Sequence, residues 1–218
     1  MKGIEELRST NVGTWPGGPA AVNCKGLSKG VVKIGWSWEA KFVYFWQGEA
    51  QLAEYLHAMV TLPGCTSDFC LVQEWVDFDF ELRLFFLPRR DWAAGTPLQP
   101  VYEQYTAWVN DEATDAPGSF LKPNYAEVLA RFAGDEKALA SAHEQAAKAS
   151  GPLIRQLLTK HSEPVPFIRM DWMVKRRGPG HAQVVFGEYC EVGADCMKWA
   201  DGPPTIWHEV LDFALSSH

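Results

Sequence analysis

The sequence lacks several features that would each point to a particular class of protein. Its five cysteines are odd in number and include no Cys-x-x-Cys pair: Cys24, Cys65, Cys70, Cys190 and Cys196. A zinc site and a disulfide framework are therefore not expected, and a reducing, cytoplasmic location fits this pattern. The first residues carry no apolar signal-peptide core, and no apolar run approaches the roughly 18 residues of a membrane helix.

An excess of positive charge is also missing. Lys and Arg number 20 against 27 Asp and Glu, which leaves a formal net charge of −7. Nucleic-acid-binding proteins usually carry a basic face. The dense basic run Lys175-Arg176-Arg177 lies beside Gly178-Pro179-Gly180 and predicts a solvated hairpin tip. Nucleic acid and membrane are not expected as partners, whereas a protein partner remains open.

Hydrophobic patterning predicts an α+β fold without regular βαβ alternation. Strands are predicted over residues 31–38, 41–46, 69–76, 80–87, 99–109, 164–174 and 183–190. Helices are predicted over residues 48–59, 125–132, a long segment capped by Asp135, and 205–215. Gly151-Pro152 lies inside the long segment and is expected to kink or split that helix. The predicted organisation is an irregular lead-in over 1–29, a small lobe over 30–98 and a large lobe over 99–218.

Two carboxylates are expected to oppose each other in the last predicted hairpin. Alternation puts Arg169 and Asp171 on one face of their strand, and a turn centred near Pro179-Gly180 puts Glu188 opposite Asp171. Opposed carboxylates repel unless a cation offsets them, and Mg²⁺ is commonly held by one or two carboxylates. The alternative is a salt-bridged surface hairpin in which Arg169 neutralises Asp171. Alternation also predicts a face shared by Phe186, Glu188 and Cys190.

A lysine inside the first predicted strand is a second candidate. Lys33 is flanked by Val32 and Ile34, and such a position is unfavourable unless the ammonium meets an anion or reaches water. A nucleotide phosphate is one such anion, and snorkelling at a sheet edge is the alternative. The following turn, which includes Ser37, has the position to fold over phosphates but lacks the spacing of a P-loop.

The third candidate is the segment Gln73-Glu74-Trp75-Val76, whose backbone can hydrogen-bond an adenine at the end of a strand. Glu81 and Arg83 share a face of the next predicted strand. Glu81 is a candidate ligand for ribose hydroxyls. The alternative is a Glu–Arg ion pair without a ligand.

In this order, these pieces resemble the ATP-grasp superfamily over roughly residues 30–192. Lys33-Ile34-Gly35-Trp36-Ser37 followed by Glu81-Leu82-Arg83-Leu84-Phe85 looks most like the eukaryotic cell-division-cycle-type proteins that assist assembly of a translation initiation factor. The resemblance implies two lobes, with ATP and Mg²⁺ as cofactors. It implies these roles: Lys33 on phosphate, Ser37 in the flap, Gln73, Glu74, Trp75 and Val76 at adenine, Glu81 near ribose, and Asp171 and Glu188 on magnesium.

The chain departs from the family pattern beside the metal position. Most members have Asn two residues after the metal-binding Glu, where this chain has Cys190 followed by Glu191. Because a thiol is a poor magnesium ligand, a second metal site would need Glu191. The usual N-terminal substrate lobe is absent or reduced to residues 1–29.

Three functions follow from the resemblance. The first is an ATP-dependent carboxylate–amine or carboxylate–thiol ligase acting through an acyl phosphate, with Lys33 stabilising the transferring phosphoryl group and Arg169 holding a small carboxylate substrate. The second is a non-catalytic ATP-binding factor that assists assembly of a protein complex. The third is a degenerate scaffold or subunit.

Overall fold

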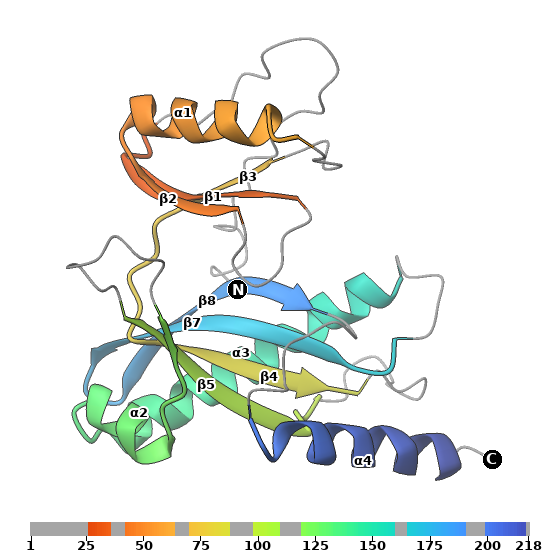
Figure 1. The fold of residues 1–218 in the computed structure, drawn as a ribbon. Helices are drawn as coiled ribbons and strands as arrows, with labels where there is room; N and C mark the ends of the chain where they lie inside the picture. The colour runs from red at the N-terminus through yellow and green to blue at the C-terminus, as the bar shows by residue number, and fades with distance from the viewer. Residues whose placement is uncertain are drawn as a thin grey trace. The chain divides into compact units, whose positions relative to one another are not determined.

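The structure is a computed structural model that describes residues 26–35, 42–63, 70–87, 98–109, 119–159, 165–190 and 199–216. The chain divides into two compact units, Met1–Val76 and Asp77–His218. Each unit contains an antiparallel sheet and at least one helix (Figure 1), which confirms the predicted α+β class. Within the described ranges, no helix is both long enough and apolar enough to cross a membrane.

The first unit is a three-stranded sheet in the order β2-β1-β3 with a helix on one face. Its elements are β1 (Lys29–Ile34), β2 (Val43–Gln47), α1 (Glu49–Val60) and β3 (Cys70–Glu74). Val32 and Ile34 of β1 pack in one core with Leu52 and Met59 of α1. Because strand residues alternate between faces, Lys33 faces away from α1. Lys33 belongs to β1, which is the central strand of the sheet, and so it does not lie on an edge strand.

The second unit is a five-stranded sheet in the order β6-β5-β4-β7-β8. Its strands are β4 (Phe80–Phe86), β5 (Tyr102–Val109), β6 (Ser119–Leu121), β7 (Ile168–Gly178) and β8 (His181–Cys190). Its helices are α2 (Tyr125–Arg131), α3 (Glu136–Leu158) and α4 (Gly202–Ser216). The lobe boundary was expected after residue 98, but β4 pairs with β5 and β7 and so belongs to this second sheet. Sheet pairing thus places Glu81 in the larger unit.

One face of the second sheet packs against α2 and α3. The core between them includes Leu82, Met170, Trp172, Val128 and Ile154, all at most 4% exposed. On the other face, α4 covers one end through a smaller cluster made by Phe85, Leu87, Phe167 and Ile206. The side chains next to this cluster on the same face are polar, and they form the candidate site.

The long helix α3 continues through Pro152 as one element, so it is not split. The Asp135 side chain caps its N-terminus by accepting a hydrogen bond from the Ala138 N–H at 3.0 Å. Near the proline, the Ser150 hydroxyl donates to the Ala146 carbonyl at 2.8 Å and accepts the Trp172 indole N–H at 3.0 Å. This link ties α3 to β7 inside the core.

Replacing Ser150 with Ala is expected to destabilise the second unit. The substitution leaves the buried Trp172 N–H without a partner, and an unsatisfied buried donor costs about 1–3 kcal/mol. Urea unfolding of Ser150→Ala beside the wild type measures this loss. Ser141→Ala on the same helix is the matched control, because Ser141 is partly exposed and accepts a hydrogen bond from the exposed Gln145 amide. Equal midpoints for Ser150→Ala and the wild type would contradict the assignment.

The β7–β8 hairpin pairs Asp171 with Glu188, as predicted, but its register contains two shifts that the sequence pattern did not indicate. The register shifts once between Arg176 and Gly178 and shifts back between Asp171 and Trp172. Each shift inserts one extra residue, Arg177 in β7 and Gly187 in β8, so the two bulges compensate.

The second bulge also changes which residues share a face. Phe186 lies opposite Trp172 and packs edge-on against its ring on the α3 side, with centroids 5.5 Å apart. Glu188 lies opposite Asp171 on the other face. The expected common face of Phe186, Glu188 and Cys190 is therefore wrong, because Gly187 breaks the alternation between Phe186 and Glu188.

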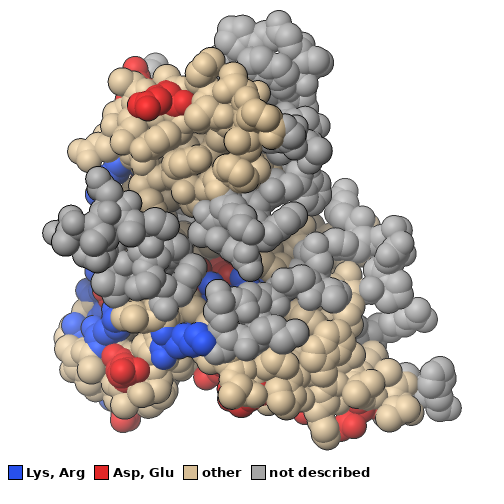
Figure 2. All heavy atoms as spheres, in the orientation of Figure 1, with Lys and Arg blue, Asp and Glu red and all other residues tan. Residues whose placement is uncertain are grey.

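Two of the three basic residues near the hairpin turn have acidic partners. Lys175 contacts Asp79 at 2.8 Å and Asp77 at 3.2 Å, and Arg176 contacts Asp135 at 3.2 Å. The Arg177 guanidinium donates to Gln183. Figure 2 shows basic and acidic spheres side by side at the lower left of the molecule. This arrangement supports the predicted solvated hairpin tip.

Candidate functional site

The polar side chains of the second sheet form a row across four strands. Antiparallel pairing aligns Gln104 of β5 with Arg83 of β4, Arg83 with Asp171 of β7, and Asp171 with Glu188 of β8. All four belong to the face opposite α2 and α3, because the residues that alternate with them fill the core on the helix side. We call Gln104, Arg83, Asp171 and Glu188 the polar row.

Asp171 is the centre of this row and is fully buried, with 0% of its surface exposed. Arg169 donates from Nε to Oδ1 and from Nη2 to Oδ2, both at 2.7 Å. The Arg83 Nε on the neighbouring strand β4 lies 3.8 Å from Oδ2. Two-point contacts of this kind are among the strongest charge-assisted hydrogen bonds in proteins. The predicted Arg169–Asp171 pair is thus present, but it is buried and not at a solvated surface.

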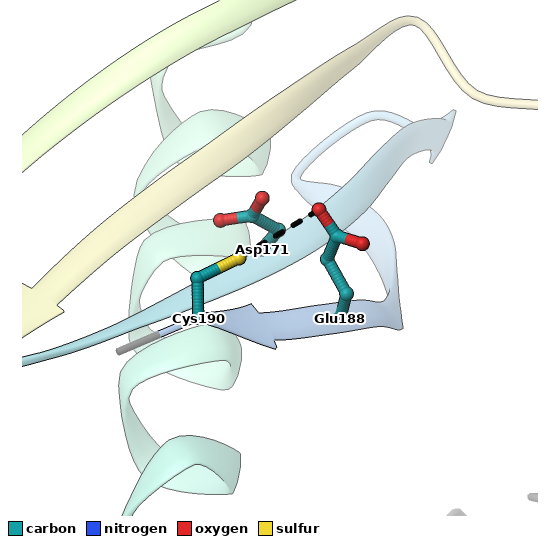
Figure 3. A group of neighbouring side chains, drawn as sticks. All are labelled: Asp171, Glu188 and Cys190. Atoms are coloured by element: carbon teal, nitrogen blue, oxygen red, sulfur yellow. Dashed lines mark hydrogen bonds between the residues drawn. The ribbon is translucent and has the colours of Figure 1, made fainter. Parts of the chain in front are cut away.

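Glu188 and Cys190 complete a group of possible metal ligands around Asp171. One ligand atom from each of the three residues lies within 4.8 Å of the others, and all three project from the same side of the hairpin (Figure 3). The Glu188 side chain is 46% exposed, and its carboxylate lies 3.6 Å from Arg169 Nη2. The Cys190 thiol is 3.8 Å from Glu188 Oε1. The group therefore has a buried carboxylate and an accessible one.

Burial controls the ionisation of this group. Desolvation raises the pKa of Asp171 to about 7, the charge of Glu81 adds to this shift, and Arg169 and Arg83 oppose it. Desolvation also raises the pKa of the Cys190 thiol to about 12. Cys190 is therefore a neutral thiol at physiological pH and contributes no charge toward a cation.

Glu81 is engaged by its neighbours on the same face. Its Oε2 accepts from the Thr106 hydroxyl at 2.6 Å and from Arg83 Nε at 3.0 Å. This is the ion-pair alternative for Glu81 and Arg83, with Thr106 as a further partner. The ribose role of Glu81 stays a prediction.

The remaining candidate residues lie in the first unit or outside the described part of the chain. Lys33 is half-buried on the face of the first sheet opposite α1. Gln73 shares that face, because Gln73 pairs with Val31 and alternates with the buried Val72. The first sheet ends at Glu74, and the connection to the second unit follows through Trp75 and Val76. Ser37 and Glu191 lie outside the described residues.

The donor set around Asp171 fits a hard divalent cation in part. Two carboxylates within 4.8 Å of each other supply the oxygen ligands that Mg²⁺ prefers. The neutral Cys190 thiol does not suit Mg²⁺. Arg169 already bonds both oxygens of Asp171, so a cation would have to approach from the side of the exposed Glu188. The residues therefore offer at most the oxygens of Asp171 and Glu188 to a single cation.

The sequence patterns missed two groups of polar contacts on β5. Gln104 and Thr106 lie on the face of the polar row and are at most 2% exposed. On the opposite face, His143 of α3 bridges Glu103 and Tyr105, each at 3.1 Å. Its hydrogen bond lowers the pKa of Glu103. Alternation along residues 99–109 already placed Gln104 and Thr106 on one face, but only the pairing with β4 connects them to the candidate site.

Comparison with known proteins adds little to this geometry. No protein-family model matches the sequence, and no curated protein matches it. One similar solved structure is the crystal structure of D-cycloserine synthetase DcsG, with 17% identity and a TM-score of 0.42. The match covers 88% of this chain and 57% of that chain, so this chain spans little more than half of its length. A similarity of this size does not assign an activity.

Proposed function

We propose that this protein binds ATP together with Mg²⁺, and that the Asp171 and Glu188 end of the polar row holds the cation and the phosphates. The observation that carries the proposal is the fully buried Asp171, aligned with the exposed Glu188 and flanked by Arg169 and Arg83. Buried charges are unfavourable and are retained mainly where a structural network or a function requires them. The resemblance to the ATP-grasp superfamily supports the same assignment.

Each residue has a defined task in this proposal. Asp171 and Glu188 would hold Mg²⁺, which when bound neutralises charge on the phosphate oxygens. Arg169 keeps the Asp171 carboxylate oriented by its two 2.7 Å hydrogen bonds. Lys33 is the candidate phosphate ligand of the first unit, and the Gln73 to Val76 backbone is the candidate adenine contact. If the protein is a carboxylate–amine ligase, Arg169 is also the candidate contact for the substrate carboxylate.

A second candidate function is ATP binding without turnover, in a factor that assists assembly of a protein complex. Cys190 favours it. Its neutral thiol stands where the family pattern has an amide ligand, so the chain offers fewer oxygen ligands than a catalytic site with two cations needs. Steady ADP release with added carboxylates and amines would support the ligase. Tight binding of ATP without ADP release would support the assembly factor.

The expected result for the wild type is a thermal stabilisation by ATP that requires Mg²⁺. At a ligand concentration 100 times the dissociation constant, stabilisation should reach about 2.7 kcal/mol. Glu188→Gln should remove most of the magnesium dependence while the ligand-free protein keeps its stability, since the side chain is 46% exposed. Thermal shift and titration calorimetry, each with and without Mg²⁺, measure both effects.

Glu144→Gln is the matched control, because Glu144 is an exposed acid on α3, which packs against the opposite face of the sheet. This variant should bind ATP and Mg²⁺ like the wild type. The proposal fails if the wild type shows no ATP-dependent stabilisation, or if Glu188→Gln and Glu144→Gln respond to Mg²⁺ alike.

A further inference from the structure

The Gln104 side chain has two polar atoms without a hydrogen-bond partner in a buried position. Gln104 is 2% exposed, and neither Nε2 nor Oε1 forms a hydrogen bond within the described structure. Buried amides are nearly always paired, because burial removes their hydrogen bonds to water. An amide that is buried and unpaired therefore needs an explanation, and a ligand absent from the structure is one.

The position of Gln104 connects it to the candidate site. It occupies the β5 end of the polar row, beside Arg83 and on the face that carries Asp171 and Glu188. With neighbouring strands about 4.8 Å apart, the Gln104 and Asp171 backbones are separated by two strand spacings, or about 10 Å. A ligand with phosphates at Asp171 and Glu188 has to be elongated to reach Gln104, as a nucleotide is.

Among the described residues, two other buried side-chain polar atoms have no hydrogen-bond partner, Trp46 Nε1 and Arg155 Nη1. Trp46 belongs to the core of the first unit, and Arg155 is on α3. Each of these nitrogens offers N–H donors and no acceptor. Gln104 differs because its side chain presents a donor and an acceptor next to each other on a face that is already polar.

The surroundings of Gln104 indicate what kind of group it would meet. The nearest charges on this face are paired: Glu81 bonds Arg83 and Thr106, and Arg83 lies between Glu81 and Asp171. A charged ligand group beside Gln104 would therefore lack a counter-ion, because the nearby charges already pair with one another. An uncharged group that both donates and accepts hydrogen bonds matches the two free atoms of the amide.

We infer that Gln104 is a specificity-determining residue that hydrogen-bonds the uncharged part of the bound nucleotide. The inference rests on the proposed binding of ATP. The shared chemistry is a neutral donor and acceptor side by side, which the sugar hydroxyls or the edge of the base can supply. Gln104 is a ligand contact and takes no part in holding the cation.

The first test is the stability of the ligand-free protein. Gln104→Met keeps the length of the side chain and removes the unpaired amide, so it should raise the unfolding temperature. A structural glutamine with partners in the protein would give the opposite change, because its partners would be left unpaired. A lower unfolding temperature for Gln104→Met would overturn the inference.

The second test is nucleotide affinity by titration calorimetry in the presence of Mg²⁺. Gln104→Met should weaken ATP binding about tenfold, whereas Gln156→Met, the same change at an exposed position of α3, should leave it unchanged. Wild-type protein should also bind 2′-deoxy-ATP, 3′-deoxy-ATP or ITP less tightly than ATP. The analogue that loses affinity in the wild type but not in Gln104→Met identifies the sugar or the base as the partner.

The outcomes separate this inference from the proposed function. If the wild type does not bind ATP with Mg²⁺, the proposed function fails and the role of Gln104 fails with it. If the wild type binds ATP and Gln104→Met binds it equally well, only the role of Gln104 is overturned. If Gln104→Met is more stable without ligand, binds ATP more weakly and no longer distinguishes one analogue, the inference holds.

Discussion

Replacing Asp171 with Asn is expected to remove magnesium-dependent nucleotide binding and to lower the free energy of unfolding by about 3–5 kcal/mol. Asp171 is 0% exposed and accepts two 2.7 Å hydrogen bonds from Arg169, with Arg83 a further 3.8 Å contact. The substitution leaves two buried guanidinium groups without their common counter-ion. Removing one member of a buried charge network is much less favourable than replacing the whole network with apolar groups.

Urea unfolding measures the stability of Asp171→Asn, and calorimetry with and without Mg²⁺ measures the effect on binding. Asp212→Asn is a suitable control, because Asp212 is 64% exposed on α4, and surface pairs contribute little. Comparison with Glu188→Gln separates the contribution of Asp171 to stability from the contribution of both carboxylates to magnesium binding. Glu188→Gln should lose magnesium dependence while it stays folded, whereas Asp171→Asn should lose both. Unchanged stability of Asp171→Asn would contradict the buried network.

Local patterns in the sequence predicted much of the second sheet. Alternation along residues 164–174 places Arg169 and Asp171 on one face, and a hairpin turn at Pro179-Gly180 brings Glu188 opposite Asp171. These features depend on neighbours in the sequence and on one short turn. The predicted carboxylate pair is present because two bulges in the hairpin, which the alternating pattern did not indicate, compensate each other.

Features that depend on pairing between distant strands were not predicted. The lobe boundary was placed after residue 98 because the sequence does not show that β4 pairs with β7, about 90 residues further along the chain. The role of Gln104 was missed for the same reason, since only its pairing with Arg83 places it in the polar row. The bulge at Gly187 was missed because an inserted residue leaves an alternating pattern on each side of it.

A glycine in the first unit gives the second large expected effect. Gly30 of β1 lies between Trp46 of β2 and Glu74 of β3. A Cβ atom at this position would come within 2.0 Å of the Gln73 carbonyl oxygen and 2.9 Å of the Trp46 ring. The nearest obstacle is backbone, so a rotamer change cannot relieve it. Gly30→Ala has to displace β3 from β1, which should cost about 3 kcal/mol or more.

Hydrogen exchange locates this damage within the chain. Gly30→Ala should accelerate exchange of the amides of β1 and β3 and leave those of α3 and β7 unchanged, because the two sheets share no strand. Val31→Thr, which adds no volume at the next and partly exposed position, should leave all of these amides protected. Under the proposed function, nucleotide affinity should fall as well, because Lys33 and Gln73 lie on the paired strands β1 and β3. Wild-type protection of β1 and β3 in Gly30→Ala would show that the close approach of Gly30 to Gln73 is not required by the fold.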